Sequence, residues 1–133
     1  MRLVSALLSL VLLAAPAASH AAEPKYGPAY DRCLAAPSGQ STVGMIECAA
    51  AELKVQDARL NRAYREALQR LDQPRQKAAL KKAQRAWIAF RDADCASLYD
   101  QDWGTLARIE ANGCMLDHTA RRADALEAYR RLR

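Results

Sequence analysis

Four cysteines and one histidine are the side chains best suited to bind a metal ion or act as nucleophiles beyond the N-terminal segment. Successive cysteines are separated by 15, 47 and 19 residues, so the sequence contains no C-x-x-C pair. Zinc sites usually draw their ligands from such close pairs, and this pattern does not supply them. We therefore expect no metal ion and no other cofactor. The five residues are Cys33, Cys48, Cys95, Cys114 and His118.

The sequence also offers no arrangement typical of a catalytic site. His118 falls on a predicted helix, but no serine or cysteine nucleophile is evident beside it. Asp92 and Asp94 point to different faces of a helix, and Asp100 and Asp102 fall in a predicted turn. Neither pair forms the acidic loop of an EF-hand. We expect a protein that is not an enzyme.

Polar residues share a helical face with apolar residues in the segment LKKAQRAWIAFRDADC, residues 80–95. Gln84, Arg91 and Asp94 fall among the apolar positions of this face, and Asp57 does so in the preceding segment. An antiparallel hairpin would bring Asp57 opposite Arg91, and a buried charge needs such a partner. We expect these four residues to form a structural polar seam. The alternative is that they line a crevice that binds a ligand.

The elements that position these residues are predicted to be helices, because helix-forming residues dominate and no alternating β-branched run occurs. We expect a short helix over residues 29–36 and a long helix from a cap at residues 41–42 to about residue 71. A third helix begins at Pro74 and ends near YDQDWGT, and a fourth runs from about residue 105 to the C-terminus. The predicted fold is all-α, a small antiparallel bundle of three long helices plus a short N-terminal helix.

Apolar residues recur at three- and four-residue steps and mark the faces expected to point inward. In the second helix these are Leu53, Leu60, Ala63, Tyr64, Ala67, Leu68 and Leu71. In the third they are Leu80, Ala83, Trp87, Ile88, Phe90 and Leu98, and in the last Ile109, Leu116, Ala120, Ala123 and Leu126.

An even number of cysteines in a small exported domain predicts two disulfides. A Cys33–Cys48 bridge would join the first two helices across the loop APSGQS, and a Cys95–Cys114 bridge would join the last two. A Cys48–Cys95 bridge is also compatible with a hairpin. We favour the two local bridges because each joins neighbouring elements. Each would stabilise the fold by about 3 kcal/mol in the chain-entropy model.

Residues 1–21 have the plan of a cleavable secretory signal peptide. Arg2 precedes the charge-free run LVSALLSLVLLAA, and small residues follow it. Cleavage after Ala21 fits the small-residue rule, and cleavage after Ala22 fits nearly as well. The alternative is a retained N-terminal anchor, although the run is short for a membrane span. No cysteine near the cleavage site could accept a lipid, so we expect residues 22–133 to be one domain in the periplasm or secreted.

Loss of Arg2 with the signal peptide lowers the formal net charge from +5 to +4, which favours weak attraction to anionic surfaces. Export and the lack of a recognition motif argue against a nucleic-acid partner. The last helix carries an arginine-rich face that either is solvated or docks to an anionic polymer or protein of the envelope. Its arginines are Arg121, Arg122, Arg130, Arg131 and Arg133.

Four segments together resemble the LprI-type lysozyme inhibitor family, an exported four-cysteine helical domain formerly catalogued as a domain of unknown function. They are MIECAAAEL, DARLNRAY, LKKAQRAWIAFRDADC and CMLDHTARRADAL, within about Cys33 to Leu126. The resemblance implies a disulfide-bonded helical domain and, for the namesake, binding to lysozyme that blocks its muramidase activity. The namesake is a lipoprotein, whereas this chain lacks the lipid-accepting cysteine. The shared positions are those assigned to core, register and disulfides, so no inhibitory residue is carried over.

An inhibitor of this kind needs a surface that suits its target. Host lysozymes of the common type are strongly basic, and they would repel a protein of net charge +4 that lacked a locally acidic surface. The predicted turn YDQDW offers Tyr99, Asp100, Asp102 and Trp103, and aromatic anchors dominate interface energetics. The alternative is that Trp103 packs on the end of the bundle. We expect a binding protein that inhibits a peptidoglycan-cleaving enzyme, or alternatively an envelope interaction module that uses its arginine-rich last helix.

Overall fold

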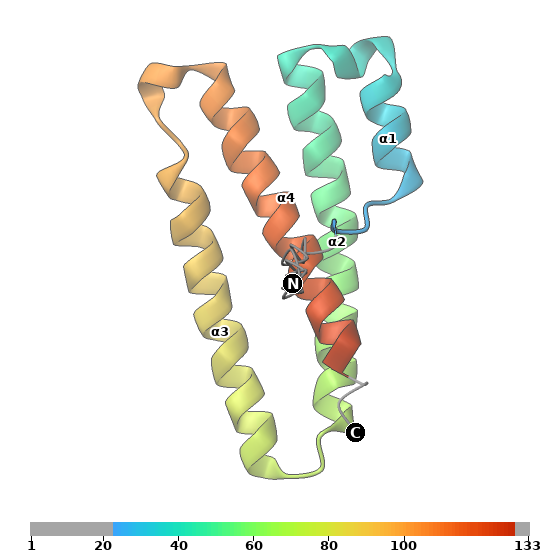
Figure 1. Ribbon diagram of the computed structural model, residues 1–133, viewed down its shortest axis with the longest axis vertical. Coiled ribbons are helices and arrows are strands. Elements are labelled where there is room, and N and C mark those ends of the chain that lie inside the picture. The colour runs from blue at the N-terminus through green and yellow to red at the C-terminus, as the bar shows by residue number, and fades with distance from the viewer. Residues whose placement is uncertain (1–22, 130–133) are drawn as a thin grey trace, which may run out of the picture.

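The computed structural model describes residues 23–129, and all regular secondary structure in this range is helical (Figure 1). The all-α prediction is therefore confirmed. The predicted signal peptide and Arg130, Arg131 and Arg133 lie outside the described residues. The elements are α1 (Pro28–Ala35), the 3-10 helix η1 (Pro37–Gln40), α2 (Thr42–Arg70), α3 (Pro74–Ser97), the 3-10 helix η2 (Gln101–Trp103) and α4 (Thr105–Ala128).

The long helices α2 and α3 begin where capping residues are available. Ser41 is the N-cap of α2, and its side-chain oxygen accepts the backbone N–H of Gly44 at 3.0 Å. Pro74 occupies the first turn of α3. The backbone N–H of the Gln73 cap donates to the side-chain oxygen of Gln76 at 3.3 Å. The predicted breaks before both helices are thus present.

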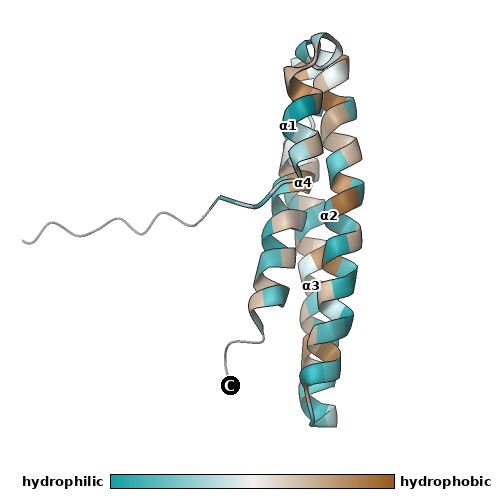
Figure 2. Ribbon diagram, turned by 90° about the vertical axis from the view of Figure 1, so that its right-hand side faces the viewer, coloured by the Kyte–Doolittle hydropathy of each residue, from teal (hydrophilic) through white to brown (hydrophobic). Residues whose placement is uncertain are grey.

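Helix α4 lies between α2 and α3 (Figure 1). It packs along much of α2 and also against α3, whereas α2 and α3 contact each other little. Viewed edge-on, the helices form a narrow, elongated bundle (Figure 2). The sequence predicted a hairpin whose two arms pair directly. The hairpin forms and α3 runs antiparallel to α2, but the direct pairing is wrong because α4 occupies the space between the arms.

The interface between α2 and α4 is built on small residues. Ala67, Ala120 and Ala123 are fully buried, and alanine side chains let two helix axes approach closely. Larger residues of all three long helices then meet toward the hairpin end. The buried members of this cluster are Leu60, Ala63, Ala67, Leu80, Ala123 and Leu126, and Tyr64, Leu68, Leu71 and Trp87 pack against it.

Helix α3 buries a narrow stripe of its surface. Only Leu80, Gln84 and Cys95 are fully buried on this helix. Trp87 is partly buried, whereas Phe90 is 55% exposed. The predicted core positions of Ala83, Ile88, Phe90 and Leu98 are therefore wrong, because α3 packs mainly against a single neighbour and the rest of its surface stays uncovered.

The two local disulfides favoured by the sequence are the ones present. The Cys33–Cys48 bridge joins α1 to α2 with Cα atoms 5.7 Å apart. The Cys95–Cys114 bridge joins α3 to α4 with Cα atoms 5.5 Å apart. All four cysteines are therefore paired, and each disulfide fixes one short or exposed helix to a better-packed one.

Two glycines allow η1 to pass close to α1 and α2. A Cβ atom at Gly39 would lie 2.0 Å from the carbonyl oxygen of Cys33, and one at Gly44 would lie 1.8 Å from that of Ser38. Both separations are far below van der Waals contact. Glycine is therefore required at both positions for the turn that the Cys33–Cys48 disulfide closes.

We predict that Leu126→Ala lowers the free energy of unfolding by about 2–5 kcal/mol, because it leaves a cavity where three helices meet. Val55→Ala, at an exposed position of α2, is the matched control and should change it by no more than about 0.5 kcal/mol. Urea denaturation followed by far-UV circular dichroism measures both. Equal losses in the two variants would contradict the placement of the core.

Candidate functional site

The polar residues predicted on α3 face α4. The side-chain oxygen of the buried Gln84 accepts a hydrogen bond from Nε of Arg122 at 2.9 Å. A guanidinium nitrogen of Arg91 donates to the hydroxyl of Thr119 at 3.4 Å. Asp94 also reaches α4, where its carboxylate lies beside His118. Three of the four predicted seam residues, Gln84, Arg91 and Asp94, therefore lie in one interface, which we call the α3–α4 seam.

Asp57 does not belong to the α3–α4 seam. Its carboxylate accepts a hydrogen bond from the side-chain amide of Asn61 at 3.0 Å, along the exposed face of α2. The expected ion pair between Asp57 and Arg91 is wrong, because α4 separates their two helices. Arg91 instead pairs with its neighbour Asp92 at 2.7 Å.

Two guanidinium groups lie over the ring of Trp87 in the α3–α4 seam. The central guanidinium carbon is 5.1 Å from the ring centre for Arg91 and 5.7 Å for Arg122. Contacts of this kind contribute about 0.5–2 kcal/mol each. Burial lowers the pKa of Arg122. The oxygen of Gln84 and the indole face stabilise its charge at this half-buried position.

Arg121 and Arg122, the two described members of the predicted arginine-rich face, are engaged within the molecule. Arg121 donates through Nε to the carboxylate of Asp117 at 2.7 Å, and this hydrogen bond raises the pKa of Arg121. Arg122 points into the α3–α4 seam. These two residues therefore give no support to an anionic docking surface on the last helix.

A second polar cluster, which was not predicted from the sequence, joins α2 to α4; we call it the Arg59 cluster. Arg59 donates to both carboxylate oxygens of Glu127, at 2.6 and 2.8 Å, and also to Asp124. This hydrogen bonding raises the pKa of Arg59 and lowers that of Glu127. The neighbouring Gln56 is buried and accepts from Arg59 at 3.1 Å. Gln56 and Arg59 are three residues apart on the apolar face of α2, and this spacing was the feature of the sequence from which the cluster could have been predicted.

A buried carboxylate on α2 anchors the segment before α1. Glu52 accepts hydrogen bonds from the backbone N–H of Gly27 and from the side-chain amide of Gln56, both at 2.7 Å. The same amide donates to the backbone carbonyl of Lys25 at 3.0 Å. Partners of this kind are what a buried acid requires, and they tie the N-terminal segment to the bundle.

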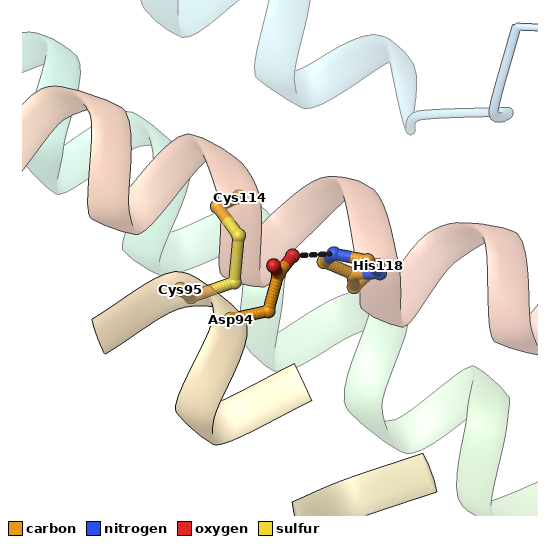
Figure 3. Close-up of side chains that lie close together, drawn as sticks. All are labelled: Asp94, Cys95, Cys114 and His118. Carbon is orange, nitrogen blue, oxygen red and sulfur yellow. Dashed lines mark hydrogen bonds and ion pairs between the residues drawn. A yellow bond between two sulfur atoms is a disulfide. The ribbon is translucent and has the colours of Figure 1, made fainter. Parts of the chain in front are cut away.

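Asp94 and His118 meet beside the Cys95–Cys114 disulfide (Figure 3). Nε2 of His118 lies 2.9 Å from the carboxylate of Asp94, and the imidazole packs edge-on against Phe90 with ring centres 5.5 Å apart. No partner for His118 could be predicted from the sequence, since Asp94 and His118 lie on different helices. Here both sulfur atoms are committed to the disulfide.

The turn between α3 and α4 presents the predicted binding residues to solvent. Tyr99 is 50% exposed and Trp103 is 60% exposed, so the alternative that Trp103 packs on the bundle end is wrong. The side chain of Asp100 accepts the backbone N–H of Asp102 at 2.8 Å, which fixes the start of η2. We call the four predicted binding residues the η2 surface; they are Tyr99, Asp100, Asp102 and Trp103.

Charge is divided between the two ends of the long helices. Residues 92–110, which include the η2 surface, contain five carboxylates and one arginine. Residues 62–85, which form the α2–α3 hairpin, contain eight basic and two acidic residues. The two segments lie toward opposite ends of the molecule (Figure 1). A protein with a positive net charge therefore carries a locally acidic end.

The family described as lysozyme inhibitor LprI matches residues 33–126, a range that holds all four cysteines, the α3–α4 seam and the η2 surface. The chain belongs to the LprI lysozyme inhibitor family. Membership of this inhibitor family agrees with the expectation that the protein is not an enzyme.

Two curated proteins are similar to the chain over about three fifths of its length. The uncharacterized protein YecT of Escherichia coli (strain K12) is 37% identical over 98 residues, which cover 62% of this chain and 60% of YecT. The uncharacterized protein R02472 of Rhizobium meliloti (strain 1021) is 32% identical over 93 residues, which cover 60% of this chain and 67% of R02472. The chain thus spans about three fifths to two thirds of these relatives. No solved structure matches it significantly.

We predict that Glu127→Gln destabilises the protein more at neutral pH than in acid. The folded-state pKa of Glu127 lies below its ordinary value of 4.5, so its contribution is present above that pH and is lost as pH falls through the folded pKa. The loss at pH 7 should stay under about 1 kcal/mol, because the side chain is 43% exposed and the pair is screened. Denaturant titrations at pH 7 and 3 measure it, and a loss of stability at pH 3 as large as that at pH 7 would contradict this origin.

Proposed function

We propose that this protein is an exported binding protein that inhibits a peptidoglycan-cleaving enzyme of the muramidase type, and that the η2 surface makes the contact. One observation carries the proposal. In a chain of the LprI lysozyme inhibitor family, two aromatic side chains and two carboxylates stand exposed on one short turn. Aromatic anchors contribute much of the binding energy at protein interfaces.

Inhibition of this kind requires a rigid obstacle rather than a reaction. Muramidases flank the scissile bond of their substrate with two carboxyl groups, and a protein that covers this site blocks substrate entry. The η2 surface suits this task because the Cys95–Cys114 disulfide joins the helices on either side and Asp100 fixes the turn. A surface ordered before binding loses little conformational entropy in the complex.

The acidic character of the η2 end supports a basic target. Five carboxylates and one arginine in residues 92–110 oppose the positive net charge of the chain. Complementary charge accelerates encounter and disfavours wrong orientations. A basic muramidase would therefore be attracted to this end and repelled by the α2–α3 hairpin.

The proposed location follows from the N-terminal sequence and the disulfides. Residues 1–21 would direct export and be removed, which leaves residues 22–133 as one domain in the periplasm or outside the cell. Two disulfides fit an oxidising compartment. Within residues 23–129, no helix has the length and apolar character needed to cross a bilayer.

We predict that the triple variant Asp100→Asn, Asp102→Asn and Trp103→Ala binds a muramidase at least about 100-fold more weakly, because it removes one anchor and two charges from the contact. Asparagine at residue 100 retains an oxygen that can accept the Asp102 backbone N–H, so the turn is preserved. Calorimetry against a panel of muramidases gives affinity, and hydrolysis of cell walls gives inhibition.

The matched control is Lys81→Gln with Lys82→Gln, which removes two exposed charges from the opposite end of α3. It should leave affinity nearly unchanged. Full inhibition by the triple variant would contradict the proposal that the η2 surface contacts the muramidase. Binding to an anionic envelope polymer that collapses with added salt, in place of muramidase binding, would favour the envelope module instead.

A further inference from the structure

We propose that reduction of the Cys95–Cys114 disulfide turns this corner of the α3–α4 seam into a zinc-binding site. The ligands would be Asp94, Cys95, Cys114 and His118, which lie together in Figure 3. Two thiolates, one imidazole and one carboxylate form a four-ligand donor set of the kind that Zn²⁺ accepts. The inference does not depend on the proposed inhibitory function.

The four side chains are close enough together to converge on one ion. Their potential ligand atoms all lie within 4.8 Å of one another. Metal–ligand lengths of about 2.0–2.3 Å place the ligand atoms of a zinc tetrahedron about 3.3–3.8 Å apart. After reduction the two sulfur atoms would move apart to this spacing, and the more distant ligand atoms would approach by about 1 Å, which side-chain rotation allows.

Each helix contributes two ligands from a suitable position. Asp94 and Cys95 are adjacent in the last turn of α3. Cys114 and His118 are four residues apart on α4, a spacing that places both on one face of a helix. Regular helices position all four ligands, and a site built on such elements is more precise than one built on loops.

Neighbouring residues support the site and leave it accessible. Phe90 packs against the ring of His118, and the hydrogen bond between Arg91 and Thr119 holds the helices together one turn away. Cys114 and His118 line an open groove on α4, next to Leu98 at the end of α3. A reductant and a metal ion can approach through this groove.

The conversion is a two-electron step. A dithiol reductant transfers two electrons and two protons to the disulfide, which gives two thiols, and is itself oxidised to a disulfide. Zn²⁺ then displaces both thiol protons and binds the thiolates, while the Asp94 carboxylate and the neutral His118 imidazole complete the coordination. Bound zinc therefore opposes reoxidation, and reoxidation releases the ion.

The Cys33–Cys48 disulfide provides an internal control. Among the described residues, the group around Cys95 is the only one with three or more potential metal ligands in reach of one another. Reduction of Cys33–Cys48 would thus yield two thiols without a neighbouring histidine and carboxylate, and it should not create a site of comparable affinity.

The test compares the purified protein in its oxidised form and after reduction with a phosphine, which spares the metal from a competing dithiol. Competition with a chromogenic chelator measures Zn²⁺ affinity. We expect one Zn²⁺ per reduced chain with a dissociation constant of about 0.1 µM or lower, and at least about 100-fold weaker binding to the oxidised chain. Co²⁺ in place of Zn²⁺ should show thiolate charge-transfer and tetrahedral absorption bands.

Three variants decide which residues bind the ion. His118→Ala and Asp94→Asn should each weaken binding to the reduced chain at least about tenfold, whereas Cys33→Ala with Cys48→Ala should leave it unchanged. Absence of binding after reduction, indifference to His118→Ala, or dependence on Cys33 and Cys48 would overturn the proposal. So would a reduced chain that loses its helical circular dichroism and does not recover it when Zn²⁺ is added.

Discussion

The contact between α2 and α4 determines where the other elements can lie. Buried alanines let these two parallel helices approach closely, and the Arg59 cluster pairs charges across the same interface. With α4 in this position, α3 has mainly α4 left to pack against. Its polar residues must therefore find partners on α4, so the composition of the α3–α4 seam follows from an apolar contact between two other helices.

A helix with a narrow apolar stripe gains little from burial, and α3 relies on other interactions to stay in place. Gln84 and Arg91 form hydrogen bonds to residues of α4, and the ring of Trp87 contacts two guanidinium groups. The Cys95–Cys114 disulfide joins the C-terminal end of α3 to α4. These interactions fix the helix that leads into η2. They would thereby keep the η2 surface in place for the contact proposed there.

Features set by short stretches of chain could be predicted from the sequence. The Ser41 cap, the start at Pro74 and the local cysteine pairs depend on residues close in sequence or on neighbouring elements. The choice of neighbour for α3 could not be predicted, because periodicity identifies the buried face of a helix but not the helix that covers it. For the same reason the Arg59 cluster and the approach of His118 to Asp94 were missed: their partners are 24 to 68 residues away in sequence.

At physiological ionic strength, salt screens the charges at one end of the bundle from those at the other. The 24 residues of α3 alone extend about 36 Å at about 1.5 Å per residue. This length exceeds four times the Debye length of about 8 Å. An approaching molecule therefore interacts with the charge of the nearest end and not with the net charge of the whole chain. To molecules in solution, the protein is therefore anionic at its η2 end and strongly cationic at its hairpin. Its isoelectric point reflects only the net charge and predicts the behaviour of neither end.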